Sequence, residues 1–195
     1  MRFITGLADL LVLLPASLAL VVVLARMGAV GEAVAYSKAL LVCLIATFAM
    51  KFAFAACGVD ESVRSPSGHV AFAATFYGSL AMLLAARRSA LARGLVAAAV
   101  VGFIVLVAAS RVALHAHSRA ETIVGAAVGL AALAVFAANR PRHAPSDAPL
   151  SAWSTLAPLA LVFLVLALPL ANHWTAEPWI DALAEDFGAL THLCR

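Results

Sequence analysis

The chain has 195 residues, of which 65% are hydrophobic and 12% are charged, and its mean hydropathy is +1.03. An average soluble domain is about 25% charged, so this composition excludes a soluble globular domain and indicates an integral membrane protein. The formal net charge of +3 is modest and the arginines are not interleaved with aromatic residues, so we expect no nucleic-acid partner.

Six apolar stretches are long enough to cross a membrane, since a spanning helix needs about 20 mostly apolar residues. Their approximate ranges are 7–25, 35–57, 67–86, 95–114, 120–138 and 153–171. The connections between them are short, and no linker rich in Pro, Gly or Ser separates two domains. We therefore expect an all-α fold, a six-span transmembrane helical bundle that forms one domain over residues 1–195.

Charged residues divide between the two sets of span ends. One set carries Arg26, Lys38, Arg87, Arg88, Arg93, Arg140 and Arg142. The other carries Asp60, Glu61, Glu177, Asp181, Glu185 and Asp186. The positive-inside rule predicts that the arginine-rich set is cytoplasmic and that both termini face outward. The alternative is that the first span is a cleaved signal peptide, because Met1-Arg2 precedes an apolar core followed by small residues.

The tail after the last span, residues 172–195, has a helical pattern of its own. Its apolar positions are Trp179, Ile180, Leu183, Phe187 and Leu190, and they lie opposite Asp181, Glu185 and Asp186. This pattern predicts a short helix on the outer membrane surface. A solvated tail without such a helix remains the alternative.

The first polar stretch, residues 65–69, reads Ser-Pro-Ser-Gly-His and precedes an apolar run. Serine followed by proline is typical of a helix start. The amides of Ser67, Gly68 and His69 are then expected to be unpaired donors at a helix N-terminus, which attracts an anion. The alternative is an ordinary capped helix with a histidine at the interface.

The second polar stretch, residues 110–121, reads Ser-Arg-Val-Ala-Leu-His-Ala-His-Ser-Arg-Ala-Glu. Ionisable residues beside membrane spans are candidates for function. His117 and Glu121 are four apart and share a helix face, so the carboxylate could fix the imidazole tautomer and make the other nitrogen a better nucleophile. Ser118 and Glu121 equally fit a capping box, in which the carboxylate caps the backbone. Both interpretations are open at this point.

Three basic residues belong with these stretches. Lys51 lies inside the second span about two turns from its outer end, where its side chain can snorkel outward. Arg64 directly precedes the first stretch, and Arg111 lies in the second. A cluster of these cations at the outer face is costly without an anion, and a phosphate group supplies one.

Together, Pro66-Ser67-Gly68-His69 and Ser110-Arg111, five residues, then His117 resemble the second and third signature motifs of the type 2 phosphatidic acid phosphatase superfamily. The resemblance covers residues 51–129. Two positions depart from the family pattern. Lys51 is followed seven positions on by Gly58 instead of Arg-Pro, which breaks the first motif and makes Arg64 the candidate for the missing guanidinium. Glu121 stands where the family usually has aspartate.

The resemblance implies a metal-independent phosphatase without a cofactor. His117 would attack phosphorus, Glu121 would orient it, and His69 would protonate the leaving oxygen and then activate water. The residues expected to bind the phosphate are Lys51, Arg64, Ser67, Gly68 and Arg111. His115 fits neither the family spacing nor the four-residue step to a carboxylate, so we expect it to line the pocket or lie at the membrane interface. The spacing of the three cysteines predicts neither a disulfide nor a metal site.

The family's membrane members act on lipid phosphates and pyrophosphates outside the membrane barrier. We therefore expect a lipid phosphatase in an inner membrane, in contact with membrane lipids, with its site facing the periplasm or exterior. The resemblance leaves undecaprenyl pyrophosphate, phosphatidic acid, phosphatidylglycerol phosphate and lipid A phosphates open as substrates. The alternative is a catalytically silent protein that binds lipid phosphates or acts as a scaffold, which the broken first motif favours.

Gly125 and Gly129 form a small-xxx-small face in the fifth span. We interpret this face as a contact within the chain that holds His117 near His69. Homodimerisation is the second interpretation.

Overall fold

The computed structural model describes residues 1–57, 65–86, 88–141 and the isolated positions 182, 183 and 186. Regular structure in these residues is helical, with no strand. The helices are α1 (Arg2–Gly6), α2 (Leu10–Arg26), α3 (Val30–Cys57), α4 (Gly68–Ala85), α5 (Ala90–Ala113) and α6 (Arg119–Asn139). The predicted all-α class is therefore confirmed over the described part of the chain.

Four of the helices are long and apolar enough to cross a membrane, namely Val30–Phe54 within α3, and the whole of α4, α5 and α6. Helix α2 is also apolar but has 17 residues. These five helices correspond to the first five predicted spans. The sixth, 153–171, lies outside the described residues, as does almost all of the predicted tail.

Three helix starts differ from the prediction by several residues: α3 begins at Val30, five residues earlier than predicted, and the starts of α2 and α5 are set by capping side chains. Helix α2 begins at Leu10 because the Asp9 carboxylate accepts a hydrogen bond from the Leu11 amide at 2.9 Å, and residues 2–6 form the separate short helix α1. Helix α5 begins at Ala90, five residues earlier than predicted, because the Ser89 hydroxyl caps the Ala92 amide. An oxygen-bearing side chain at such a position satisfies an amide that the helix itself cannot pair.

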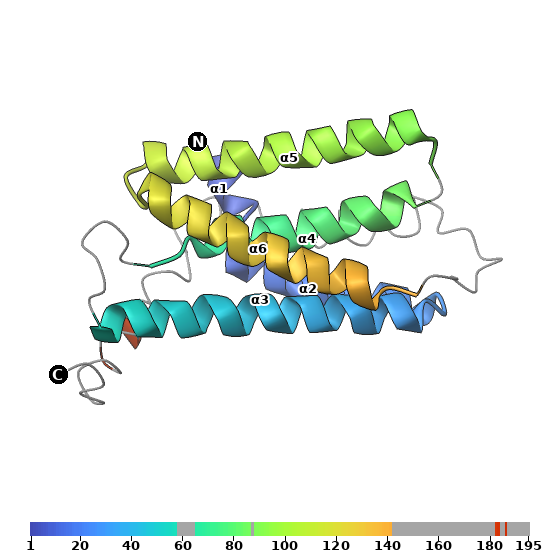
Figure 1. Ribbon diagram of the computed structural model, residues 1–195, viewed down its shortest axis with the longest axis horizontal. Helices are drawn as coiled ribbons and strands as arrows, with labels where there is room; N and C mark the ends of the chain where they lie inside the picture. Colours follow the sequence, from blue (N-terminus) through green and yellow to red (C-terminus); the bar gives the residue numbers. More distant parts are fainter. Residues whose placement is uncertain (58–64, 87, 142–181, 184–185, 187–195) are drawn as a thin grey trace.

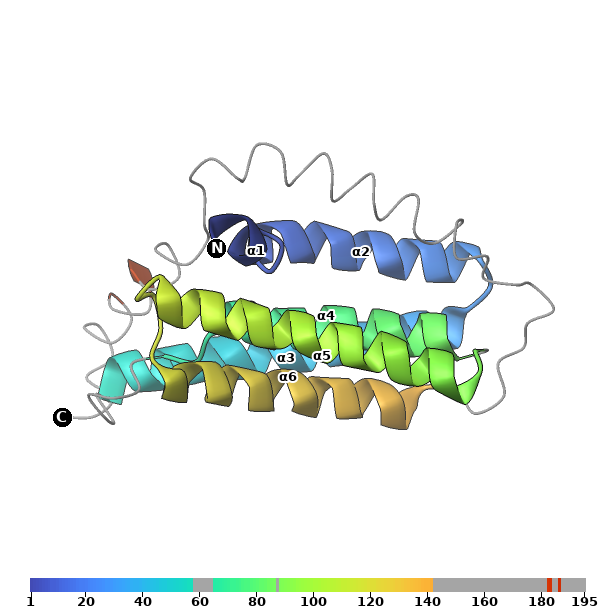
Figure 2. The same cartoon turned by 90° about the horizontal axis from the view of Figure 1, so that it is seen from above.

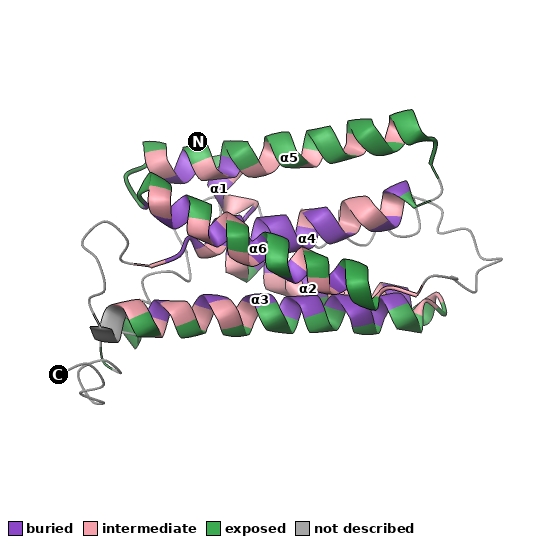
Figure 3. Cartoon of the chain, in the orientation of Figure 1, coloured by how far each residue is buried: buried purple, intermediate pink, exposed green. Residues whose placement is uncertain are grey.

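The long helices run side by side, and α4 lies among the others (Figures 1 and 2). It packs against α2, α3, α5 and α6, and every residue in the segment 69–76 is buried. Helix α5 is the opposite case. Its buried residues are Val107, Ser110 and Arg111, all near its C-terminal end, and the rest of its length is largely exposed (Figure 3). Its apolar surface is therefore available to lipid chains.

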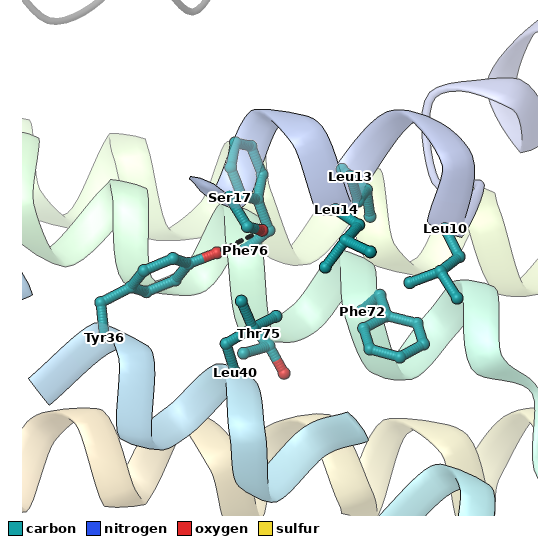
Figure 4. A pocket seen from close by; sticks show the side chains of 9 residues that line it. All are labelled: Leu10, Leu13, Leu14, Ser17, Tyr36, Leu40, Phe72, Thr75 and Phe76. Atoms are coloured by element: carbon teal, nitrogen blue, oxygen red, sulfur yellow. Dashed lines mark hydrogen bonds between the residues drawn. The ribbon is translucent and has the colours of Figure 1, made fainter. Parts of the chain in front are cut away.

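Helices α2, α3 and α4 meet in a junction that positions α2 over the start of α4. Leu10, Leu13 and Leu14 of α2 face Phe72, Thr75 and Phe76 of α4 (Figure 4). The side chains leave no space for a water molecule in this junction. The Ser17 and Tyr36 hydroxyls share a buried hydrogen bond of 2.7 Å between α2 and α3 (Figure 4). This hydrogen bond between α2 and α3 supplements the apolar packing of the junction.

Helices α4 and α6 approach closely because α6 presents glycine to α4. A Cβ atom added at Gly129 would lie 2.6 Å from both the Ala71 carbonyl oxygen and the Ala74 side chain. One added at Gly125 would collide with the Ser67 carbonyl oxygen. The prediction that this face packs within the chain is confirmed. The contact sets the first turns of α6 directly against the start of α4.

Both polar stretches lie at one end of the bundle, where α3 and α5 end and α4 and α6 begin (Figure 1). The described basic residues of the predicted cytoplasmic set belong to the other end: Arg26, Lys38, Arg88, Arg93 and Arg140. There Lys38 donates to the Asn139 side chain at 3.0 Å, and Arg140 donates to the Met82 carbonyl at 3.1 Å. The described arginines and the lysine of that set therefore lie together at the end of the bundle opposite the two polar stretches, as the predicted orientation requires.

Candidate active site

The start of α4 is held by Glu121. The Ser67 amide donates to the Glu121 carbonyl oxygen at 3.0 Å, and the Ser65 amide donates to Glu121 Oε1 at 2.9 Å. The expectation that the Ser67 amide is an unpaired donor was therefore wrong, because α6 supplies its acceptor. The Ser67 hydroxyl makes no cap for its own helix and is buried without a hydrogen-bond partner. A buried hydroxyl in that state is unusual, and it is the group that Ser67 can offer a ligand.

The Glu121 carboxylate makes both contacts that the sequence left as alternatives. Its Oε2 atom lies 3.1 Å from His117 Nδ1 and accepts a hydrogen bond of 2.7 Å from the Ser118 amide. The Ser118 hydroxyl in turn accepts from the Glu121 amide at 3.2 Å, which completes a capping box. Because Oε1 is occupied by the Ser65 amide, one buried side chain joins the two polar stretches.

The turn between α5 and α6 explains where His115 and His117 lie. Helix α5 ends in a Schellman motif, in which the Ala116 amide donates to the Arg111 carbonyl at 3.1 Å and the His115 amide donates to the Val112 carbonyl at 3.0 Å. His115 occupies the left-handed position of this motif with φ +56°, and its side chain is exposed. His115 therefore ends the helix with its side chain exposed. His117, two residues on, is buried.

Lys51 and Arg111 are both buried at this end of the bundle, with 4% and 5% of their surface exposed. The Lys51 ammonium donates to the Ser65 hydroxyl at 3.4 Å. Lys51 therefore extends to the first polar stretch and is buried there. Arg111 follows Ser110, whose hydroxyl lies 3.0 Å from the Thr5 hydroxyl of α1. Arg64 lies outside the described residues.

Sequence reasoning missed one residue at this end, Asp9. Its Oδ2 atom lies 3.2 Å from His69 Nε2, and both side chains are buried. The signal was present in the sequence, because Asp9 is an acidic residue inside the first predicted span, 7–25, and ionisable residues inside spans are candidates for function by default. Among the described residues, no three His, Cys, Asp or Glu side chains are grouped closely enough to hold a metal ion.

The contacts form two linked groups. Hydrogen bonds connect Lys51, Ser65, Glu121 and His117 in one series. His69, two residues after Ser67 at the same helix start, contacts Asp9. The His117 amide also lies 3.4 Å from the Arg111 carbonyl oxygen, so the backbone at Arg111 is tied to the turn that carries His117. The fold thus gathers cations, imidazoles and a helix N-terminus at one end of the bundle.

These features define an all-helical protein, with helices apolar enough for a membrane and a cationic, histidine-containing site at one end. Residues 36–145, more than half of the chain, match the family model of the PAP2 superfamily. The chain belongs to this superfamily, which confirms the resemblance seen in its motifs and indicates phosphatase activity. The matched segment contains every site residue predicted from sequence but not Asp9.

One similar curated protein is the "Uncharacterized 22.5 kDa protein in cps region" of Klebsiella pneumoniae. It is 32% identical over 176 residues, which cover 85% of this chain and 81% of the relative. No solved structure matches the chain significantly.

Proposed function

We propose that this protein hydrolyses a phosphate monoester or pyrophosphate carried by a lipid, at the outer face of the membrane and through a phosphohistidine intermediate that needs no metal. One observation carries the proposal: the Glu121 carboxylate contacts His117 Nδ1 with one oxygen and the Ser65 amide with the other. The candidate nucleophile is thereby fixed beside the helix start that carries Ser67, Gly68 and His69.

His117 acts as the nucleophile through Nε2. A carboxylate only accepts hydrogen bonds, so Nδ1 carries the hydrogen in the contact with Glu121. The Nε2 lone pair attacks phosphorus, a P–N bond forms, and the P–O bond to the leaving group breaks. Glu121 holds the ring in this orientation and balances the positive charge that the ring acquires, which is the role of the carboxylate in a nucleophile–base–orienter arrangement.

His69 transfers the protons. In the first step it donates a proton to the leaving oxygen, which departs as a lipid alcohol, or as a lipid monophosphate if the substrate is a pyrophosphate. In the second step a water molecule attacks the phosphohistidine, gives a proton to His69, and the P–N bond breaks to release inorganic phosphate. General acid and base catalysis of this kind contributes about 10²–10⁴-fold to a rate.

The substrate's phosphate binds among Lys51, Arg111, the Ser67 hydroxyl and the Gly68 amide, with Arg64 as a further ligand. Lys51 and Arg111 are buried cations at this end of the bundle, and their positive charge is complementary to that of an anionic phosphate. The same groups stabilise the charge on the phosphoryl oxygens in the transition state, where charge stabilisation and positioning are the main sources of catalysis.

A lipid substrate fits the surroundings of the site. Spanning helices carry the site to one end of the bundle, and α5 next to it presents an exposed apolar surface. Arginine and lysine at the opposite end support a cytoplasmic location for that end and an outward-facing site in an inner membrane. Undecaprenyl pyrophosphate, phosphatidic acid, phosphatidylglycerol phosphate and lipid A phosphates all satisfy the chemistry.

The test is phosphate release by the purified full-length chain from this panel of lipids, with and without a chelator. We expect activity that survives the chelator and is lost in His117→Ala. Activity lost to the chelator would contradict the phosphohistidine scheme, and an active His117→Ala variant would contradict the assignment of the nucleophile.

The broken first motif favours a second candidate, a silent protein that binds lipid phosphates without cleaving them. Purified protein that binds one of these lipids but releases phosphate from none would support this second candidate. The Lys51 contact with Ser65 opposes it, because the lysine of the broken motif still reaches the site.

A further inference from the structure

The segment of residues 5–9, which joins α1 to α2, is fastened to the helices that carry the site. The Thr5 hydroxyl contacts the Ser110 hydroxyl of α5 at 3.0 Å. The Tyr77 hydroxyl of α4 donates to the Leu7 carbonyl at 2.9 Å. In the third contact Asp9 Oδ2 lies 3.2 Å from His69 Nε2, a pair that is ionic when the imidazole is protonated. The position of Asp9 is therefore built by three separate contacts, and it lies outside the segment 36–145 that matches the superfamily.

Capping alone does not account for an aspartate at this position. The cap of α2 uses Oδ1, which accepts from the Leu11 amide, and a neutral asparagine or serine caps a helix about as well as aspartate does. The second oxygen, Oδ2, faces His69 instead. Asp9 is 2% exposed, and a buried carboxylate is costly unless an opposite charge or hydrogen bonds compensate it. The negative charge of Asp9 is thus placed to interact with His69 as well as to cap α2.

We propose that Asp9 is the positioning residue of His69: it orients the imidazole and attracts the imidazolium form that donates a proton to the leaving oxygen. The inference rests on the proposed function and adds to it a second carboxylate, so that each histidine has its own, Glu121 for His117 and Asp9 for His69. In the proton-transfer step, His69 goes from imidazolium to imidazole as the leaving oxygen becomes a hydroxyl. It returns to imidazolium when it takes a proton from the attacking water.

Leaving-group dependence tests this role, because an alkoxide needs a proton to depart and nitrophenolate does not. The experiment compares a short-chain phosphatidic acid with p-nitrophenyl phosphate in a rapid-quench assay of the first turnover. The main variant is Asp9→Asn, which keeps the cap and removes the charge. Ser89→Ala is the matched control, since it removes the cap of α5 at the other end of the bundle.

For Asp9→Asn we expect the first-turnover rate on phosphatidic acid to fall about 10- to 100-fold at unchanged KM, as part of the contribution of a general acid is lost. The first turnover on p-nitrophenyl phosphate should stay within about 3-fold of wild type. Asp9→Glu, which restores the charge, should recover most of the rate on phosphatidic acid, and Ser89→Ala should change neither rate. If Asp9→Asn does not fold, Asp9→Ser, which also keeps a capping oxygen and removes the charge, takes its place, and a wild-type ratio of the two rates there overturns the proposal.

Equal losses on both esters would also overturn the role of Asp9, since they indicate a merely structural effect. Wild-type rates in Asp9→Asn, with His117→Ala inactive, would overturn the role of Asp9 alone. Wild-type protein that releases phosphate from no lipid of the panel, or an active His117→Ala variant, would overturn the proposed function and the role of Asp9 with it.

Discussion

Replacing Gly125 with alanine tests how strictly the site depends on the approach of α6 to α4. The added Cβ would collide with the Ser67 carbonyl oxygen and lie 3.2 Å from the Ser67 nitrogen. Both atoms are backbone, so no side-chain rotation relieves the contact and the start of α4 must move. Overpacking costs about 1–3 kcal/mol, and alanine recovers about 1 kcal/mol of helix propensity over glycine. With a backbone obstacle we expect the upper part of this range, a net loss of about 2 kcal/mol.

A shift of the α4 start also moves Ser67 and His69 relative to His117. Displacement by about 1 Å in a catalytic site can cost about 10²-fold in rate. The assays are thermal unfolding in detergent, where we expect Tm to fall by about 4–8 °C, and phosphate release, where we expect about 10²-fold less activity.

The matched control is Gly102→Ala in α5, where no atom lies within 4 Å of the added Cβ. It should leave activity unchanged and raise Tm by about 2–4 °C. A Gly125→Ala variant with the Tm and activity of the Gly102→Ala control would refute the close approach on which the site is built.

Three further substitutions separate structural from chemical roles. Ser118→Ala should cost about 1 kcal/mol of stability with turnover largely kept. Glu121→Gln should lower turnover and also cost about 1–3 kcal/mol of stability, because glutamine offers one acceptor oxygen where the Ser65 and Ser118 amides each donate to a separate carboxylate oxygen; wild-type turnover of Glu121→Gln in phosphate-release assays would contradict the role proposed for the carboxylate. His115→Gly should stabilise the protein by about 1 kcal/mol, because glycine adopts positive φ without strain, and phosphoenzyme formation should be unchanged; loss of the phosphoenzyme would reverse the assignment of the nucleophile. Tyr36→Phe should lower the free energy of unfolding by about 1 kcal/mol, since it leaves the Ser17 hydroxyl without its 2.7 Å partner. It should leave kcat unchanged, and a lower kcat in phosphate-release assays would show that the contact between α2 and α3 influences the site.

The parts of the fold that could be predicted from the sequence are those coded by local patterns. Hydropathy located α2 to α6, because each is one apolar run. The small-xxx-small spacing of Gly125 and Gly129 predicted a close helix contact, and the four-residue step from His117 to Glu121 predicted their contact. Each of these features depends on residues within a few turns of one another.

The remainder of the site depends on contacts between distant segments. The Ser67 amide is paired by the Glu121 carbonyl, and Lys51 is buried under Ser65. Neither contact can be predicted from residue spacing, because each depends on how two helices are shifted relative to one another along the bundle axis. Asp9 was missed for the same reason: its partner is 60 positions away in the chain, and locally it is one helix cap among several.

The triple use of the Glu121 carboxylate has a consequence for biosynthesis. His69 and Ser67 are synthesised before the last helix of the site, and the residue that fixes their helix start to His117 arrives only with α6. Because chains are made from the N-terminus, a nascent chain that ends after α5 contains Lys51, His69 and Arg111 but neither His117 nor the Glu121 side chain that holds the start of α4. Completion of the site therefore requires α6, because a chain that ends before α6 lacks the contacts that hold the start of α4 beside His117.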